Sequence, residues 1–446
     1  MTTPARNIPF KNLNADARRN LALVAACLLY IFTFIAVILH PGVLLGAGSD
    51  FLALWSAGKA AILYGYSQIY NLEVLQQIQF LPLQDVFASP QDFYPIPVPY
   101  FPVFILPFQL FSLLDARTGF WVYSVFSAVV LAGYLLFFLR RLLPGRKLDS
   151  GQKVLAAALM VSYPVLSNLL FGQVEIFLFI CAGEMIRAAQ AKKSQLCGAW
   201  MGGLLLKPQL LLLVIPALLL MRHWKLLAGF VLVSTLVLLS SLALSGPEGL
   251  ADMIGLWTSY VPGVASNSPH AMANWRMLAV NFNTWTNSWF GWIPAVLGIL
   301  ATLYIWIRLS LVRAAFGSPR WILNLAAVMA ASGAVTWHSH IHMCMALIPF
   351  LLYAVFFFPG DAVRKAVDWF SFSYPAALLL GYLYLLTAVI WKFQPVANLN
   401  NFLLGLAGLG VYLNILATMP KVHPEHDSLQ FQQQTLTPSN DRSQIQ

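Results

Sequence analysis

Long apolar blocks, each about 20 residues long and separated by short polar breaks, dominate the sequence. A helix of about 20 residues crosses the roughly 30 Å hydrocarbon core of a bilayer, so blocks of this length are typical of transmembrane helices. The chain is 59% hydrophobic and 9% charged, whereas soluble domains average about 45–50% and about 25%. Strands of a membrane β-barrel would be shorter and would alternate in polarity. The pattern predicts an all-α polytopic membrane protein.

About twelve blocks (11–13) qualify as membrane spans in a sequence-based reading. They cover residues 21–39, 119–139, 154–171, 174–189, 196–206, 209–221, 226–245, 289–307, 321–336, 342–358, 374–391 and 399–418. One further stretch, residues 98–114, is short and contains three prolines. Because proline interrupts regular helices, this stretch is either a span or a re-entrant or interfacial element.

The distribution of Lys and Arg decides the orientation, since these residues collect on cytoplasmic loops. If residues 98–114 do not span, all but five of the 26 basic residues fall on one side of the membrane. The five on the other side are Lys59, Arg117, Lys207, Arg276 and Lys392. This topology predicts a multi-pass protein of the plasma (inner) membrane with both termini in the cytoplasm. It also explains the net charge of +10 without nucleic acid as a partner.

The expected organisation is a cytoplasmic N-terminal segment (1–20), a membrane domain (21–418) and a polar, Gln-rich tail (419–446) that we expect to be disordered. The two long outer loops are residues 40–118 and 246–288. Neither loop is large enough to act as a separate soluble domain. Any catalytic site is therefore expected on the non-cytoplasmic face, assembled from these loops and the outer ends of the helices.

The first outer loop begins with a candidate catalytic acid, Asp50. The residues that follow it, including Trp55, predict an amphipathic helix at the membrane surface. A carboxylate there is suited to act as general base for an acceptor hydroxyl, although Asp is also a common helix N-cap. Further along, Tyr94 opens a proline-rich segment that is either a rigid loop re-entering the membrane or a simple connector.

Polar groups at outer helix ends form the second set of candidates. Gln173 and Glu175 lie near the end of a span, where they are suited to bind substrate or to join helices by hydrogen bonds. Lys207 breaks what would otherwise be one apolar run into two short helices. Its ammonium is suited to bind a lipid phosphate, and snorkelling to the interface is the alternative. Arg276 is suited to a phosphate oxygen or to a loop salt bridge.

Three histidines, His338, His340 and His342, follow Trp337 at the outer end of another span. The spacing of the first and third would suit two metal ligands on a helix, but no neighbouring carboxylate completes the set. Hydrogen bonding of His338 and His340 to a sugar, phosphate or lipid is the favoured interpretation, and Asn274 is a further candidate for the polar rim. No metal site or cofactor is expected, and neither a Walker loop nor a Gly-x-Gly-x-x-Gly motif is present.

In order along the chain, these motifs resemble those of glycosyltransferase family 87, the polyprenyl-phosphate-mannose-dependent mannosyltransferases with the GT-C architecture. The resemblance covers roughly residues 40 to 350. It rests on Asp50, Phe51, Trp55, Ala57, Gly65, Tyr70, Tyr94, Pro95, Ile96, Pro97, Gly172, Gln173, Gly198, Gly202, Gly203, Lys207, Pro208, Thr336, Trp337 and His340. Three features depart from the family pattern: Glu175 stands in place of Asn, Ser339 in place of a histidine, and His338 and His342 are additional.

The resemblance implies a GT-C-type bundle that transfers a hexose, mannose in the family, from a polyprenyl-phosphate sugar donor to a lipid or glycan acceptor. Transfer on the non-cytoplasmic face would invert the anomeric centre in a single displacement. Asp50 would be the general base, and Lys207 and Arg276 would bind the donor phosphate. Trp55, Tyr94, Gln173, Glu175, Asn274, His338 and His340 would contact substrate. Membrane lipids are further expected partners.

Two other classes of function remain open from the sequence. A multi-pass transporter or lipid flippase of envelope precursors would also need many spans and broken helices, but it commonly shows two related halves and ionisable groups at mid-membrane. Here no internal repeat is evident, and the distinctive polar groups gather at the outer edge. A non-catalytic assembly protein would leave Asp50 and Lys207 dispensable.

Overall fold

A computed structural model describes residues 15–38, 43–44, 48–145, 147–258, 269–390 and 399–422. Helices and their connections make up these residues, and no strand occurs among them, which confirms the expected all-α class. Most of the tail expected to be disordered, most of the cytoplasmic N-terminal segment, and Lys392 lie outside the described residues.

The α-helices are α1 (Ala15–Ile38), α2 (Ser49–Tyr64), α3 (Leu72–Phe80), α4 (Leu106–Phe111), α5 (Ala116–Leu142), α6 (Ser150–Met160), α7 (Tyr163–Phe171), α8 (Glu175–Gln190), α9 (Ser194–Gly202), α10 (Val214–Leu220), α11 (Trp224–Thr258), α12 (Trp275–Thr286), α13 (Trp292–Ser310), α14 (Pro319–Val335), α15 (Ile348–Phe357), α16 (Asp361–Ile390) and α17 (Leu399–Thr418). The 3-10 helices are η2 (Tyr66–Gln68), η3 (Leu81–Leu83), η4 (Pro90–Asp92), η5 (Pro102–Ile105), η6 (Gly203–Leu206), η7 (Pro208–Leu211), η9 (Pro269–Ala271), η10 (Ile341–Leu347) and η11 (Met419–Lys421).

Seven helical segments among the described residues are long and apolar enough to cross a membrane. They are Ala17–Ile35, Ala116–Leu142, Ser150–Phe171, Trp224–Thr258, Trp292–Ser310, Asp361–Thr387 and Leu399–Lys421. The remaining predicted spans are built from shorter pieces: α8 has 16 residues and α14 has 17, and others join short α- and 3-10 helices. Length and composition therefore support a multi-pass membrane protein with seven long helices among the described residues, and they do not confirm the predicted count of about twelve.

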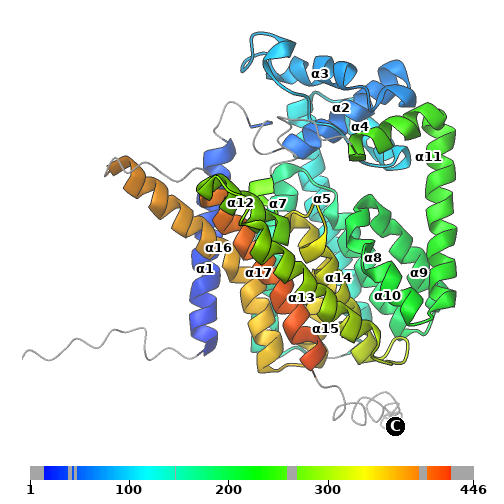
Figure 1. Cartoon of the computed structure of the whole chain (residues 1–446), viewed down its shortest axis with the longest axis vertical. Helices are drawn as coiled ribbons and strands as arrows, with labels where there is room; N and C mark the ends of the chain where they lie inside the picture. Colours follow the sequence, from blue (N-terminus) through cyan, green and yellow to red (C-terminus); the bar gives the residue numbers. More distant parts are fainter. Residues whose placement is uncertain are drawn as a thin grey trace, which may run out of the picture.

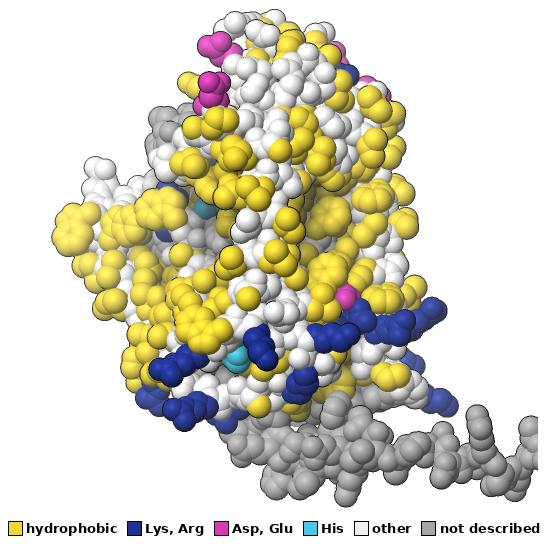
Figure 2. All heavy atoms as spheres, turned by 90° about the vertical axis from the view of Figure 1, so that its right-hand side faces the viewer, with side chains coloured by type: hydrophobic (Ala, Val, Ile, Leu, Met, Phe, Trp, Pro, Cys, Tyr) yellow, Lys and Arg dark blue, Asp and Glu magenta, His cyan; other side chains and the backbone are white. Residues whose placement is uncertain are grey.

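The long helices run along the long axis of the molecule, and α2, α3 and α4 lie at its upper end (Figure 1). The first described turn of α1 and the last turn of α17 lie at the opposite, lower end. Lys and Arg side chains gather around this lower end, acidic side chains lie at the top, and apolar side chains cover the surface between them (Figure 2). The surface is thus apolar over the middle and charged at both ends, as a membrane-spanning bundle requires.

Two expectations about the first outer loop can be compared with the structure. The only α-helix in residues 98–114 is α4, and together with η5 it makes a helical segment of ten residues, Pro102–Phe111, too short to cross a bilayer as a helix. The predicted helix after the first span is present as α2, but ten of its 16 residues are buried. Helix α2 is therefore covered by neighbouring elements, α3 and α4 among them, instead of presenting one polar face to water.

Helix α11 bends where Gly246 adopts a φ of 71° and Pro247 follows. The helix packs against the first outer loop through η2 and η5: Ser241, before the bend, accepts from the Val103 N–H at 3.5 Å, and Gly249, beyond it, faces Ser67. The indole N–H of Trp257 donates to the carbonyl oxygen of Pro99 at 2.9 Å. The outer part of α11 therefore supports the proline-rich segment, whose next residue, Tyr100, lies in the candidate site described below.

Glycines allow α9 and α11 to approach until their backbones touch. A Cβ added at Gly198 would overlap the carbonyl oxygen of Leu226, and one added at Gly229 would overlap that of Gln195. Small residues at crossing points are a usual means of packing helices within membranes.

Replacing Gly198 with Val is therefore expected to force α9 and α11 apart and to lower stability by about 1–3 kcal/mol, the usual cost of overpacking. Thermal unfolding of the detergent-solubilised protein measures the effect. Gly133→Ala in α5 is the matched control, because a Cβ at Gly133 meets no atom within 4 Å. Equal unfolding temperatures for the two variants would contradict the close α9–α11 contact.

Candidate functional site

Two glycines join the start of α2 to the end of α7. Gly48 has a φ of 78°, and its N–H donates to the carbonyl oxygen of Leu170 at 2.9 Å. Gly172 has a φ of 67°, and a Cβ there would overlap the Cβ of Phe51. Only glycine adopts such φ values and permits such an approach at low cost. The contact brings Asp50, which precedes Phe51, beside Gln173, which follows Gly172.

Asp50 lies in the first turn of α2, where Gly48 occupies the N-cap position. Its carboxylate accepts a hydrogen bond from the side-chain N–H of Gln173. Asp50 is therefore not the N-cap of its helix, which was the alternative left open by the sequence. Burial raises the pKa of Asp50 above its usual range, while the Lys207 ammonium and the Gln173 hydrogen bond act in the opposite direction and offset part of this rise.

Gln173 is the centre of the polar cluster. Its side-chain oxygen lies 3.4 Å from the Lys207 ammonium and 3.5 Å from the Tyr100 hydroxyl, both of which donate to it. Its backbone carbonyl accepts from the Tyr123 hydroxyl at 2.8 Å. Gln173 thus connects the general-base candidate to the lysine, and its amide is held on both sides.

Lys207 lies in the break between η6 and η7, where its φ of −139° interrupts the helical path. Its ammonium is 3.2 Å from Oε1 of Glu175 and 5.0 Å from the centre of the Tyr100 ring. Nε2 of His342 approaches the same Glu175 oxygen at 3.4 Å. The Glu175 side chain is fully buried in the first turn of α8, and its backbone N–H donates to the side-chain oxygen of Asn168 at 2.9 Å.

The three histidines do not lie on one helix. His338 and His340 lie in the irregular connection after α14, and His342 lies in η10, so the spacing suited to two ligands on a helix is not realised. The rings of His338 and His340 are 4.7 Å apart, and those of His340 and His342 are 5.4 Å apart. Among the described residues, no group of three His, Cys, Asp or Glu side chains is arranged to hold a metal ion.

His338 lies near enough to both Lys207 and Arg276, the second outer cation, to be affected by their charges. Burial lowers the pKa of His338 well below its usual range, and the charges of His340, Lys207 and Arg276 lower it further. Lys207 and Arg276 therefore both act on His338 electrostatically. The Arg276 guanidinium stacks 3.8 Å from the centre of the Trp337 ring and donates to the Trp337 carbonyl at 3.3 Å.

Asn274 holds the connection between α14 and η10 in place. Its side-chain oxygen caps α12 by accepting from the backbone N–H of Met277, and its amide N–H groups donate to the carbonyl oxygens of Thr336 and Trp337. All of these polar atoms have protein partners. With these bonds Asn274 holds the connection that carries His338 and His340, and its expected contact with substrate stays a prediction.

Two of the predicted site residues are not part of the cluster. Trp55 is buried, and its indole N–H donates to the carbonyl oxygen of Leu114 at 3.1 Å, so it fastens α2 to the segment before α5. Tyr94 is 66% exposed in the proline-rich segment. The structure brings together Asp50, Gln173, Glu175, Lys207, His338 and His340, with Arg276 at the edge.

Sequence reasoning did not select Tyr100, Tyr123 or Asn168. Tyr100 belongs to the same proline-rich segment as Tyr94, and a second tyrosine there was the available signal. Tyr123 and Asn168 lie within apolar blocks, where one polar side chain among many apolar ones reveals its partner only after folding.

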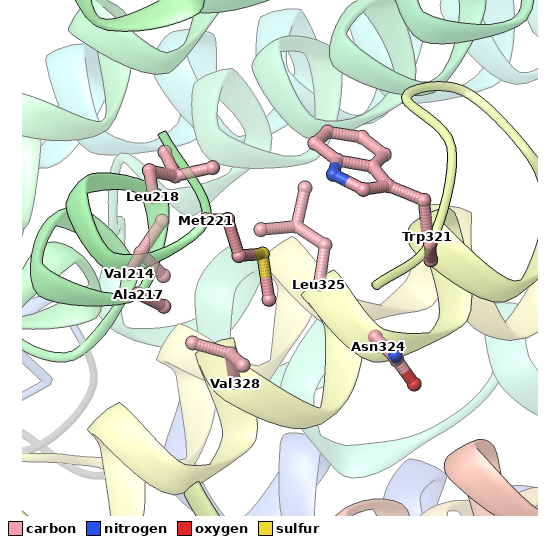
Figure 3. A pocket seen from close by; sticks show the side chains of 9 residues that line it. Val214, Ala217, Leu218, Met221, Trp321, Asn324, Leu325 and Val328 are labelled. Atoms are coloured by element: carbon pink, nitrogen blue, oxygen red, sulfur yellow. The ribbon is translucent and has the colours of Figure 1, made fainter. Parts of the chain in front are cut away.

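An apolar pocket lies away from this cluster, between α10 and the N-terminal half of α14 (Figure 3). It is lined by Val214, Ala217, Leu218, Met221, Ala314, Trp321, Asn324, Leu325 and Val328. Asn324 is the one polar amide in this lining, and no acid, base or cation is present among these residues. The polar cluster around Gln173 is therefore the candidate site, because it combines two carboxylates with a buried lysine at outer helix ends.

Comparison with known proteins gives one family. The sequence model described as glycosyltransferase family 87 matches residues 99–336, more than half of the chain. No curated protein and no solved structure matches the chain. The match begins next to Tyr100 and includes Gln173, Glu175, Lys207 and Arg276.

Proposed function

Because the chain belongs to glycosyltransferase family 87, we propose that this membrane glycosyltransferase moves a hexose, mannose, from a polyprenyl-phosphate sugar donor to a lipid or glycan acceptor. The observation that carries the proposal is the convergence of Asp50, Gln173 and Lys207 at one end of the bundle. A base and a cation are the two groups that such a transfer needs.

In the proposed reaction, an acceptor hydroxyl attacks the anomeric carbon of the donor sugar. The new bond joins the acceptor oxygen to that carbon, and the bond from the carbon to the phosphate oxygen breaks. The leaving phosphate keeps the electron pair, and Asp50 takes the hydroxyl proton. One displacement of this kind inverts the anomeric centre. The raised pKa of Asp50 supports the role, because a general base works best with a pKa near the working pH.

Lys207 is proposed to offset the charge that develops on the leaving phosphate. Its side chain is 12% exposed, and its ammonium is fixed by Gln173 and by the ring of Tyr100. A cation already in position stabilises developing charge more effectively in a water-poor site than in water. Arg276 is proposed to bind the same phosphate from the far side of His338, and His338 and His340 the sugar. With these cations in place, no divalent ion is needed.

The charge distribution supports a reaction on the non-cytoplasmic face. The basic rim in Figure 2 lies at the end where α1 begins and α17 ends, which the positive-inside rule places in the cytoplasm. Helix α2, which carries Asp50, lies at the other end. We therefore propose a plasma (inner) membrane protein in which residues 21–418 form the membrane domain and both termini are cytoplasmic.

Transfer of radiolabelled mannose from polyprenyl-phosphate-mannose into membrane lipid or glycan tests the proposal. Lys207→Ala is expected to lower the rate by about 100-fold, the usual effect of removing a group that stabilises developing charge. EDTA is expected to leave the wild-type rate unchanged. Lys147→Ala, which removes an exposed lysine outside the site, is the matched control and should retain full activity.

Three results would count against the proposal. Full activity of Lys207→Ala would show that this lysine takes no part in catalysis. Inhibition by EDTA would show that the reaction needs a metal ion. If the wild type transferred no sugar from any of several polyprenyl-phosphate sugars, the catalytic assignment would fall and transport would become the better explanation. Unfolding temperatures of both lysine variants are measured beside the rates, because removing Lys207 leaves the buried Glu175 unpaired.

A further inference from the structure

Around Lys207, carboxylates outnumber cations, because Arg276 lies only at the edge of the candidate site. Lys207 is its central cation, whereas two carboxylates lie beside it: Glu175 at 3.2 Å, and Asp50, which is connected through Gln173. Glu175 is fully buried, and neither of its side-chain oxygens receives a hydrogen bond from a described residue. A carboxylate in this position depends on its ion pair and on the N-terminal end of α8, whose dipole favours negative charge.

In the empty site Lys207 pairs with Glu175, although the proposed function assigns Lys207 to the donor phosphate. A phosphodiester brings one more negative charge into the same buried volume. With Asp50, Glu175 and the phosphate all ionised against Lys207 and Arg276, the site would hold one uncompensated negative charge, and such an arrangement is strongly unfavourable where water is scarce. One proton restores the balance, and Glu175, which loses its partner when Lys207 turns to the phosphate, is the group that would then be left buried and unpaired.

We propose that Glu175 is an exchangeable counter-ion: it pairs with Lys207 in the empty site and takes up a proton when the donor phosphate replaces it. The inference rests on the proposed function, since it assumes an anionic lipid-phosphate donor. Nε2 of His342, 3.4 Å from Glu175, lies where it can pass or share that proton. Glu175 acts through Lys207 and is a positioning residue. The consequence is that binding of the phosphodiester consumes one proton.

Other titratable groups lie near Glu175, and the test must separate its protonation from any change in theirs. They are Asp50 on α2, Tyr100 before η5, Tyr123 on α5, Lys207 between η6 and η7, His338 and His340 before η10, His342 in η10 and Tyr412 on α17. Of these, the histidines are the main competitors, because their ordinary pKa lies near neutrality.

Binding of a short-chain prenyl methyl phosphodiester to the full-length protein, measured between about pH 6 and pH 8.5 by calorimetry, tests the proposal. This probe carries one negative charge throughout the range and has no sugar to transfer. In the wild type, affinity should fall by up to about tenfold per pH unit as pH rises, the slope expected for uptake of one proton. In Glu175→Gln the affinity should become independent of pH and should exceed that of the wild type at the alkaline end.

Glu184→Gln is the matched control. Glu184 also lies on α8 and is paired with a cation, Arg187 at 2.6 Å, so its removal should leave the wild-type slope intact. His342→Gln should retain the slope as well. A slope that survives in Glu175→Gln, or disappears in His342→Gln, would overturn the role of Glu175 and assign the proton elsewhere. Failure of the wild type to bind the phosphodiester at any pH would instead contradict the lipid-phosphate donor, so the two hypotheses fail separately.

Discussion

Replacing Asp50 with Asn is expected to lower the transfer rate by about 1,000-fold, within the 10²- to 10⁴-fold contribution of a positioned general base. Asparagine keeps the shape of the side chain but cannot take the proton of the acceptor hydroxyl. The turnover number at saturating donor and acceptor measures the effect, since binding of both substrates should change little. Asp252→Asn is the control, because Asp252 is an exposed acid on the outer part of α11.

The dependence of the rate on pH gives a second readout for Asp50. Burial raises the pKa of this carboxyl, so the rate should increase with pH through that raised pKa and level off above it, where the carboxylate is ionised. An ordinary exposed aspartate would already be ionised at a lower pH. A variant Asp50→Asn that retained wild-type turnover, or an unchanged pH profile in it, would show that another group is the base.

Gly172→Ala is expected to damage both stability and transfer. A methyl group at this position would overlap the Cβ of Phe51, and the φ of 67° is costly for any residue with a side chain. Together the left-handed conformation and the overlap should cost about 2–4 kcal/mol. Because Phe51 follows Asp50, its displacement should also move the carboxylate, and a shift of about 1 Å can cost about 100-fold in rate.

Gly65→Ala separates the two causes of damage at Gly172. Gly65 also has a positive φ, 89°, but a Cβ there meets no atom within 4 Å. The variant Gly65→Ala should therefore lower the unfolding temperature without a comparable loss of turnover. If Gly172→Ala lost only as much activity as Gly65→Ala, the contact between Gly172 and Phe51 would not be what positions Asp50.

The positions of the helices could be predicted well from the sequence, but their continuity could not. The block 226–245 became the first part of α11, and a second helical part reaches Thr258 beyond Gly246, whose φ of 71° is not helical. The block 154–171 became two helices, α6 and α7, separated at Val161 and Ser162. Hydropathy measures how apolar a stretch is, and it does not register whether the backbone hydrogen bonds run without interruption.

The candidate site, too, could be predicted only in part: its residues could be selected from the sequence, but their contacts could not. Asp50, Gln173 and Lys207 could be selected from residue type and position, because polar groups at outer helix ends are few in such a chain. Their contacts could not be predicted: Glu175 pairs with Lys207 only because η6 and η7 meet beside the start of α8. Asn274 had the right chemistry for substrate, yet it caps α12, and only the fold distinguishes these uses.

The bend in α11 also divides that helix into two lengths. The part before Gly246 runs from Trp224 to Ser245, roughly 22 residues or about 33 Å at the helical rise. That length by itself covers the hydrocarbon thickness of a bilayer, about 30 Å. With that part spanning the hydrocarbon, as the proposed topology has it, the part after the bend would lie at or above the lipid headgroups, beside η2. Under the proposed function, a lipid-linked sugar would then meet the enzyme at the membrane depth where its lipid chain ends and its sugar begins, and the length of α11 before the bend would set that depth.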